Sequence, residues 1–498
     1  MPEQFLSLEN ISKRYVGVQA LDAVDFTMST GEIHCLVGGN GSGKSTLIKI
    51  ISGVVRPDAG AVIEIGGERF QDFGAIDAIR QGIEVIYQDL SLFPNMTVAE
   101  NIALSEIIAA GQTLVKRQDM KEIAQTAMGK IKANLPLDEL VGEISLADQQ
   151  LVAICRALTH DVKLVIMDEP TTALTRKEVK ALFAVVKDLQ AKGISTMFVS
   201  HKLDEVFEIA EQVTILRDGK KVGSYPRQEL DDDKLIFLMT GQKLDYSKHT
   251  EQVNKEMILL DVQQLSKQGN FKDINFQLYP GEILGITGLL GSGRTELAKA
   301  LFGLNPADSG QILLDGHAVQ IDDVPTAVNL GIAYVPENRL VQGLVMQQAV
   351  GKNIVLTILN RLLNKLGLIN QDKMQQSIEH WINELAIKVP SSEAAVQTLS
   401  GGNQQRVVLA KWMATDPNIL ILDGPTVGVD VAAKSAIHNI IRSLAVEGRG
   451  IIIISDELME VFQNCGRVFV MHKGRFKTEF DTYQTTQDEI QDYINQLD

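Results

Sequence analysis

The chain has 498 residues, of which 45% are hydrophobic and 22% charged, as in an ordinary globular protein of roughly two to four domains. It carries 63 acidic and 47 basic residues, so its net charge of −16 argues against binding to nucleic acid. Its three cysteines are too far apart for a metal site or a disulfide framework, which fits a reducing cytosol. We find no signal peptide and no apolar run of membrane-spanning length, so we expect any membrane association to be peripheral.

The sequence contains an internal repeat. Residues 31–60 match residues 281–310 at a constant offset of 250 positions, without a gap. Further along, VIMDEPTTAL (165–174) corresponds to ILDGPTVGVD (421–430), which aligns Asp168 with Asp423. A repeat of this length indicates two homologous domains, which we place at residues 5–240 and 257–493. The polar segment 241–256 would be a short linker between them.

Each half shows the same predicted order of elements. A β-rich start (5–11 and 257–265) leads to a strand, a glycine loop and a helix, and a helical middle follows over 97–160 and 348–415. Short apolar runs come next, over 163–168 and 195–200 in the first half and over 418–423 and 450–455 in the second. Apolar runs that alternate with helices are typical of parallel strands covered on both faces. The predicted class is therefore α/β, with a parallel-sheet core and an inserted helical subdomain in each half.

The first glycine loop has the spacing of a phosphate-binding loop. It consists of Gly38, Gly39, Asn40, Gly41, Ser42, Gly43, Lys44, Ser45 and Thr46. Glycines after a strand let backbone N–H groups surround phosphate oxygens, and the N-terminus of the following helix favours their negative charge. Lys44 would add a mobile positive charge, and the Ser45 hydroxyl would bind Mg²⁺. The alternative is a glycine-rich turn without function, which the order of strand, loop and helix disfavours.

Two carboxylates follow the apolar run 163–168. Loops and strand ends meet at the carboxyl edge of a parallel sheet, so we expect Asp168 and Glu169 to lie beside the first glycine loop. Asp168 would hold Mg²⁺, directly or through water, and Glu169 would orient and polarise an attacking water. An acidic cap at the end of a strand is the alternative interpretation of the pair by itself.

Further motifs point to a known family. They are the signature segment LSGGNQQR (399–406), Gln88 in IYQDL and His201 in FVSHKLDE. With the glycine loops and the carboxylate pair, they resemble the motifs of the ATP-binding-cassette (ABC) family, in the family's order and over nearly the whole chain. The second glycine loop, GLLGSGRTEL (288–297), and the signature segment are also similar to those of double-cassette ATPases from bacterial monosaccharide importers.

The resemblance implies two P-loop domains that sandwich ATP and Mg²⁺ head to tail. Each site would combine the glycine loop of one half with the signature segment of the other. In site one, Gln88 would contact the γ-phosphate and the metal, His201 would contact the γ-phosphate, and Tyr15 would stack on adenine. Taken alone, each of these three would be an ordinary surface or packing residue. The remaining site-one residues would be Lys44, Ser45, Asp168 and Glu169 with Ser400, Gly401 and Gly402.

Site two would lack several of these groups. Its loop keeps Gly288, Gly291, Gly293 and Thr295, with Arg294 in place of the lysine. The other replacements are Glu337 for Gln88, Gly424 for Glu169, Asp456 for His201, and Leu146 and Ala147 for the signature glycines. Because these losses sort by site and not by half, we expect one hydrolytic site and one silent or slow site. The second site could still bind nucleotide through Arg294, Thr295 and Asp423, or be an empty structural half.

The function implied by the resemblance is that of the energising subunit of a sugar importer. The chain would act at the cytoplasmic face of the inner membrane, held there only by transmembrane permease subunits, expected in two copies. A periplasmic or extracellular sugar-binding protein would take part through the permease. The alternatives are a tandem cassette acting on ribosomes or nucleic acid, a nucleotide sensor and an exporter ATPase. The short linker and acidic charge disfavour the first, and the intact Glu169 and His201 disfavour the second.

Overall fold

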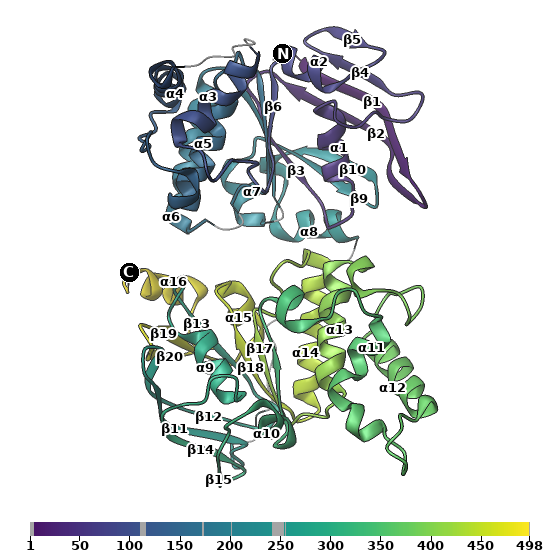
Figure 1. Cartoon of the computed structure of the whole chain (residues 1–498), viewed down its shortest axis with the longest axis vertical. Helices are drawn as coiled ribbons and strands as arrows, with labels where there is room; N and C mark the ends of the chain where they lie inside the picture. The colour runs from purple at the N-terminus through teal and green to yellow at the C-terminus, as the bar shows by residue number, and fades with distance from the viewer. Residues whose placement is uncertain are drawn as a thin grey trace. The chain divides into compact units, whose positions relative to one another are not determined.

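The computed structural model describes residues 4–109, 116–171, 174–200, 202–241, 253 and 255–497 (Figure 1). The chain divides into two compact units, Met1–Leu244 and Asp245–Asp498. Each unit contains a four-stranded sheet and a six-stranded sheet. Among the residues just given, no helix is long and apolar enough to cross a membrane.

The antiparallel sheet of the first unit opens the chain. Its strand order is β2-β1-β4-β5. The first two strands alternate buried and exposed residues, the pattern of strands with one face on the core. The strands are β1 (Gln4–Tyr15), β2 (Val18–Ser29), β4 (Val62–Ile65) and β5 (Glu68–Phe70).

The six-stranded sheet forms the core of the first unit and has the order β10-β9-β3-β8-β7-β6. Strands β9, β3, β8, β7 and β6 are parallel, whereas β10 pairs antiparallel at the edge. All five residues of β3 are buried, which explains why four of them are apolar; the exception is His34. The strands are β3 (Ile33–Val37), β6 (Ile83–Ile86), β7 (Leu164–Asp168), β8 (Ser195–Val199), β9 (Gln212–Arg217) and β10 (Lys220–Pro226).

Helices of the first unit surround this sheet, and α3, α4 and α5 pack together as the inserted helical subdomain. In Figure 1 this subdomain and the antiparallel sheet lie at opposite sides of the unit. The helices are α1 (Lys44–Ile51), α2 (Ala75–Arg80), α3 (Val98–Ala109), α4 (Arg117–Ile131), α5 (Leu146–Ala157), α6 (Arg176–Ala191), α7 (Leu203–Ile209) and α8 (Asp232–Thr240), with short 3-10 turns η1 (Val141–Glu143) and η2 (Arg227–Glu229).

The second unit repeats both sheets. Its antiparallel sheet, β12-β11-β14-β15, comprises β11 (Leu260–Lys267), β12 (Phe271–Leu278), β14 (Ser309–Leu314) and β15 (His317–Val319). Its core sheet, β16-β17-β18-β13-β19-β20, comprises β13 (Ile283–Gly288), β16 (Ile332–Val335), β17 (Ile419–Asp423), β18 (Gly450–Ile454), β19 (Arg467–His472) and β20 (Arg475–Asp481). Within this core sheet, the edge strand β20 runs antiparallel and the other strands are parallel.

The second unit also carries a helical subdomain, in which α11 packs on α12 and α13. The predicted α/β class with a β-rich start, a largely parallel core sheet and an inserted helical region is therefore confirmed for both halves. The helices are α9 (Arg294–Leu301), α10 (Val324–Asn329), α11 (Val350–Val355), α12 (Gln371–Glu384), α13 (Gly401–Met413), α14 (Val431–Val446), α15 (Leu458–Asn464) and α16 (Gln487–Asn495), with the π-helix η3 (Arg339–Gly343) and 3-10 turns η4 (Leu356–Leu362) and η5 (Val396–Thr398).

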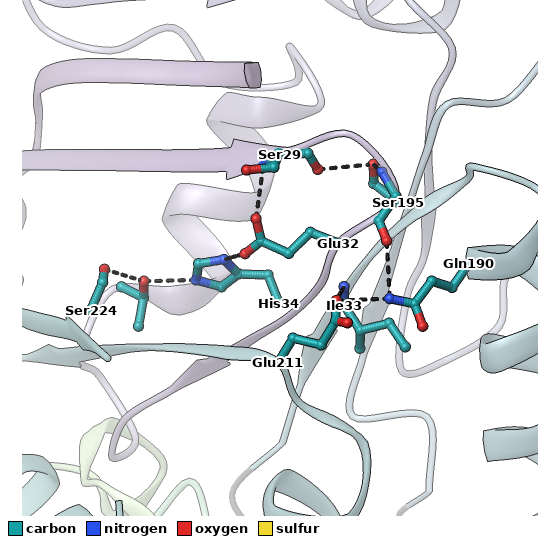
Figure 2. A network of polar contacts seen from close by, with 10 residues as sticks. Ser29, Glu32, Ile33, His34, Gln190, Ser195, Glu211 and Ser224 are labelled. Atoms are coloured by element: carbon teal, nitrogen blue, oxygen red, sulfur yellow. Dashed lines mark hydrogen bonds and ion pairs between the residues drawn. The ribbon is translucent and has the colours of Figure 1, made fainter. Parts of the chain in front are cut away.

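A buried polar network fixes the start of β3, at the end of the strand away from the glycine loop (Figure 2). The ring of His34 is 2% exposed and bonds to Glu32 Oε1 at 2.7 Å and to Thr214 Oγ1 at 2.8 Å. The second carboxylate oxygen of Glu32 accepts the backbone N–H of Ser29. Because buried polar groups are costly unless they are hydrogen-bonded, this network ties β2, β3 and β9 into one register.

Candidate functional site

The first glycine loop connects β3 to α1 and has a backbone that only glycine fits. Gly38, Gly41 and Gly43 have φ angles of 157°, 77° and 101°. A Cβ on Gly38 would lie 2.3 Å from the carbonyl oxygen of Leu216, and one on Gly43 would lie 2.6 Å from that of Ala20. These contacts press the loop against neighbouring backbone, so its shape is set before any ligand binds.

Lys44 opens α1 and is folded back over the loop. Its side chain is 8% exposed, and Nζ donates hydrogen bonds to the carbonyl oxygens of Gly38 at 2.7 Å and Gly39 at 3.0 Å. The ammonium group thus lies over the first residues of its own loop. Of the other predicted loop residues, Asn40, Gly41 and Ser45 are exposed, Gly43 and Thr46 half-buried, and Ser42 buried.

The carboxylate pair lies at the end of β7 and within the field of the loop. Burial and the charge of Glu169 raise the pKa of Asp168, and the charges of Lys44 and Lys49 oppose the rise. Glu169 has a φ of 49°, a left-handed conformation that is rare for a residue with a side chain, while its N–H bonds to the carbonyl oxygen of Val199. The structure therefore brings the first loop and both carboxylates to one edge of the sheet, as predicted.

A buried glutamate that the sequence motifs did not reveal links two segments at this edge of the sheet. The carboxylate of Glu205, 6% exposed, accepts hydrogen bonds from Thr171 at 2.7 Å and Ser200 at 2.8 Å. It therefore joins the segment after β7 to the segment after β8. The second unit repeats the device, since Glu460 accepts a hydrogen bond from Thr426 at 2.8 Å. Comparison of the two halves would have found it, because Ser200 and Glu205 recur as Ser455 and Glu460.

Of the remaining first-unit residues, the structure describes Gln88 and Tyr15. Gln88 is exposed just beyond the end of β6, the neighbour of β7 in the sheet. Tyr15 ends β1 beside a two-residue turn and exposes 43% of its surface, so its ring is accessible to a planar partner. His201 lies outside the described residues.

The signature segment belongs to the second unit, where it begins α13. Ser400 is the N-cap, but its hydroxyl makes no capping bond to the backbone and instead accepts a bond from the Asn403 amide at 3.0 Å. A Cβ on Gly402 would lie 2.5 Å from the Cβ of Ala433. Close packing inside the second unit thus demands glycine here, in addition to any contact with phosphate.

The second glycine loop has the same backbone as the first but different chemistry. Gly288, Gly291 and Gly293 have φ angles of 149°, 74° and 101°. Arg294 is 8% exposed, and its Nη1 donates to the carbonyl oxygen of Ser455 at 2.8 Å, just beyond the end of β18. The guanidinium is therefore pinned to the neighbouring strand, whereas Lys44 stays over its own loop.

A cavity of about 240 Å³ lies beside this second loop. Burial lowers the pKa of Arg294, and four surrounding carboxylates oppose that effect. One cation among four carboxylates makes the cavity acidic, which opposes the entry of a polyphosphate. The charged residues of its lining are Arg294, Glu296, Glu337, Asp423 and Asp456, and Thr295 lies among them.

Gly424 stands at the position of Glu169 and shares its left-handed backbone, with a φ of 57°. A Cβ built there would lie 2.9 Å from Val427 Cγ2 and 3.1 Å from Glu337 Cγ. Val427 therefore occupies space that a side chain at position 424 would need. Val427 and Glu337 thus leave no room for a side chain at the position where the first unit has its carboxylate.

Asp423, the counterpart of Asp168, is 3% exposed and already has protein partners. The hydroxyl of Tyr334 donates to its Oδ2 at 3.0 Å. Burial raises the pKa of Asp423, and hydrogen bonds from Thr295 and Tyr334 oppose the rise. A metal ion at this carboxylate would have to compete with these bonds.

The hairpin that corresponds to Tyr15 also differs between the units. In the second unit, β11 and β12 are joined by Gln268, Gly269 and Asn270, so no aromatic residue occupies the turn. Phe271, the first residue of β12, is 3% exposed and packs in the core. The sequence comparison did not anticipate this absence of an aromatic residue from the turn.

A glycine loop between a core strand and a helix, with a carboxylate at the end of a nearby parallel strand, defines a P-loop nucleotide-binding domain, here present twice. Residues 21–172 and 271–427 match the family model for the ABC transporter, and the chain belongs to this family. The resemblance drawn from the motifs is thus confirmed.

Two relatives match over nearly their full length. The chain is 40% identical to the putative ribose/galactose/methyl galactoside import ATP-binding protein 1 of Agrobacterium fabrum, over 98% of this chain and 97% of that protein. It is 42% identical to the ribose import ATP-binding protein RbsA 3 of Rubrobacter xylanophilus, over 95% and 94%. A solved ATP-binding cassette of an ABC transporter in its ADP conformation is 28% identical over 48% of this chain and 99% of that one, with a TM-score of 0.43.

Proposed function

We propose that this chain is the ATP-hydrolysing subunit of an importer for a monosaccharide or a related small sugar. The observation that carries the proposal is the first glycine loop with Lys44, which lies at the same edge of the sheet as Asp168 and Glu169, in a chain 40% identical over 98% of its length to a protein named for sugar import. We further propose that hydrolysis takes place at this loop alone.

ATP would bind with its β- and γ-phosphates in the first glycine loop. The exposed backbone N–H groups and the N-terminus of α1 would receive the negative charge. Lys44 would exchange its bonds to the loop carbonyls for bonds to phosphate oxygens, which is a short movement for a flexible side chain. The donor set fits Mg²⁺, because the Ser45 hydroxyl, the Gln88 amide and the Asp168 carboxylate are hard oxygen ligands. When bound, Mg²⁺ neutralises charge on the transferred phosphoryl group.

Glu169 would orient the attacking water and receive its proton. Its left-handed backbone is strained, and residues kept in such a conformation cluster at functional sites. His201 would contact the γ-phosphate, and Tyr15 would stack on adenine. Ser400, Gly401 and Gly402 of the second half would complete this site with the N-terminus of α13.

The second glycine loop would not hydrolyse ATP. Its cavity lacks a carboxylate at position 424, carries four other carboxylates, and holds Arg294 against β18. With no carboxylate at position 424 and with Arg294 bonded to Ser455, an attacking water lacks the orienting groups that the first loop would supply. We propose that this loop serves a structural or regulatory role in the same chain.

The partners proposed are transmembrane permease subunits, in two copies, and a periplasmic or extracellular sugar-binding protein that acts through them. The chain would work at the cytoplasmic face of the inner membrane, held by the permease. The regions of Gln88 and Glu337 are exposed in their respective units and would transmit closure to the permease.

The test is isolation of the tagged chain from gently solubilised membranes, followed by reconstitution of the co-purified complex in vesicles. We expect a multispanning membrane protein to co-purify, and the vesicles to take up a labelled pentose or hexose only with ATP. A Glu169→Gln chain should assemble equally but support no uptake. Co-purification of ribosomes without a membrane protein would contradict the proposal.

A further inference from the structure

Arg339 lies two residues after Glu337 and begins the π-helix η3 (Arg339–Gly343). Its guanidinium donates to two backbone carbonyl oxygens, those of Val427 at 2.5 Å and Gly428 at 3.0 Å. Both acceptors follow β17, in the segment that closes over position 424. A short π-helix is an uncommon element and is frequent at functional sites.

The same guanidinium lies against the signature segment. A Cβ on Gly401 would come within 2.9 Å of Arg339 Nη2 and within 3.0 Å of the Gly428 carbonyl oxygen. Gly401 therefore leaves the space that the guanidinium and this carbonyl fill. The first turn of α13, the loop after β17 and the start of η3 meet at this one side chain.

The far end of η3 is held by α13 as well. Lys411 is 6% exposed, and its Nζ donates to the carbonyl oxygen of Gly343 at 2.5 Å. Thus Arg339 bonds the start of η3 to the loop after β17, which packs against Gly401 in the first turn of α13, and Lys411 bonds the end of η3 to the last turn of α13. Because η3 is held in this way at both ends, we expect a shift of the Glu337 region to displace the signature segment as well.

The first unit has changed both members of this contact together. Two residues after Gln88 it has Leu90 in place of Arg339, and α5 begins with Leu146 in place of Gly401. There Arg156 of α5 donates to the carbonyl oxygens of Leu90 and Ser91, at 3.0 Å and 2.8 Å. The guanidinium beside the signature glycine thus accompanies the intact signature segment, which is the one proposed to serve hydrolysis.

We propose that Arg339 is a positioning residue for hydrolysis: it holds the signature segment in the geometry that site one requires, and couples that geometry to Glu337 in the wall of the cavity beside the second glycine loop. This rests on the proposed function, since it assumes that Ser400, Gly401 and Gly402 complete the site on the first loop. Arg339 would touch neither nucleotide nor water. Its effect would therefore fall on turnover and not on the binding of ATP by the first loop.

The experiment measures steady-state ATP turnover by the complete chain with Arg339→Ala, Arg339→Lys and the control Arg442→Ala. Arg442 matches Arg339 because it is half-buried and donates to two acceptors in the same unit, Asn464 Oδ1 at 3.0 Å and the Gln463 carbonyl oxygen at 3.4 Å.

We expect Arg339→Ala to lower kcat by at least about tenfold and to change KM by less than about threefold, because small misplacements of positioning groups act on the chemical step. Lysine keeps the charge but not the fork, so Arg339→Lys should restore part of kcat. The control should keep kcat within about twofold of the parent, since its bonds to Asn464 and Gln463 join α14 to α15.

Unchanged kcat in a folded Arg339→Ala chain would overturn the inference, and so would an equal loss in Arg442→Ala. If Arg339→Ala does not fold, Arg339→Lys decides: a lowered kcat at parental melting temperature supports the inference, and parental kcat overturns it. Failure of the proposed function would look different, because then the parent itself would not hydrolyse ATP, or Glu169→Gln would leave its turnover intact.

Discussion

The two glycine loops have nearly identical backbones and opposite surroundings. Their three glycine φ angles differ by at most 8° between the units. In both units the first glycine of the loop is pressed against a carbonyl oxygen of the neighbouring strand. A Cβ added to this glycine would lie 2.3 Å from the oxygen of Leu216 in the first unit and 2.1 Å from that of Met471 in the second. Loop shape is therefore held by contacts with the sheet, and it persists where the chemistry has been replaced.

The residue after the metal-ligand position makes the same comparison sharper. Glu169 and Gly424 share a left-handed backbone, with φ angles of 49° and 57°. The first unit keeps a side chain in this strained conformation, whereas glycine relieves the strain in the second unit. The units thus differ in side chains placed on one scaffold, which lets single substitutions test each unit separately.

The largest difference in ATP turnover is expected between substitutions of Lys44 and Arg294, the cations of the two loops. Lys44→Ala should lower ATP turnover by about a hundredfold or more, because the transferred phosphoryl group loses the positive charge of the lysine. Arg294→Ala, the matched change in the second loop, should keep turnover within about threefold of the parent, since this guanidinium bonds to Ser455. Steady-state phosphate release decides it, and a larger loss in Arg294→Ala would reverse the assignment of the two loops.

Opposite stability changes are expected at the shared left-handed position. Glu169→Gly should stabilise the first unit by about 1 kcal/mol by removing backbone strain, while it abolishes turnover. Gly424→Ala should destabilise the second unit by about 1–3 kcal/mol, because the new Cβ is both strained and crowded by Val427.

The two tryptophans, Trp381 and Trp412, both lie in the second unit, so tryptophan fluorescence reports its unfolding, whereas circular dichroism reports both units. Gly424→Ala should shift the fluorescence transition, and Glu169→Gly should leave it in place. A stabilised fluorescence transition in Gly424→Ala would refute the crowding at this position.

A smaller, pH-dependent difference is expected at Glu84 on β6, which aligns with Ala333 in the second unit. Burial raises the pKa of Glu84 from 4.5 to about 6, although the charge of Arg156 opposes the rise. With the folded pKa above the unfolded one, the favourable contribution is complete below pH 4.5 and is lost as the pH rises through about 6. Glu84→Gln should therefore gain about 1–2 kcal/mol on the parent between pH 4.5 and pH 7, as measured by urea unfolding at each pH. A difference that does not vary with pH would mean that Glu84 does not titrate in this range.

The local features of the site could be predicted from sequence, because they depend on spacing along the chain. Glycines at fixed intervals after a strand determine the backbone of the loops. Asp168 ends the apolar strand β7, and Glu169 is the next residue. The repeat itself exposed the replacement of Lys44 by Arg294 and of Glu169 by Gly424.

Contacts between distant segments could not be predicted in this way. The bond from Arg294 to Ser455 spans 161 residues and the bond from Tyr334 to Asp423 spans 89, so neither leaves a local pattern. The space that Val427 fills beside Gly424 became apparent only from the packed structure. The same holds for Arg339, whose neighbour Gly401 the sequence assigned to phosphate binding alone.

The most direct test of a single hydrolytic site is ATP turnover by the purified chain with Glu169→Gln, measured beside the parent and Lys44→Ala. We predict that Glu169→Gln lowers magnesium-dependent turnover to roughly 1% of the parent or less while ATP still binds. Turnover within about tenfold of the parent, and above that of Lys44→Ala, would show that Glu169 is not the essential orienting group and would contradict the account.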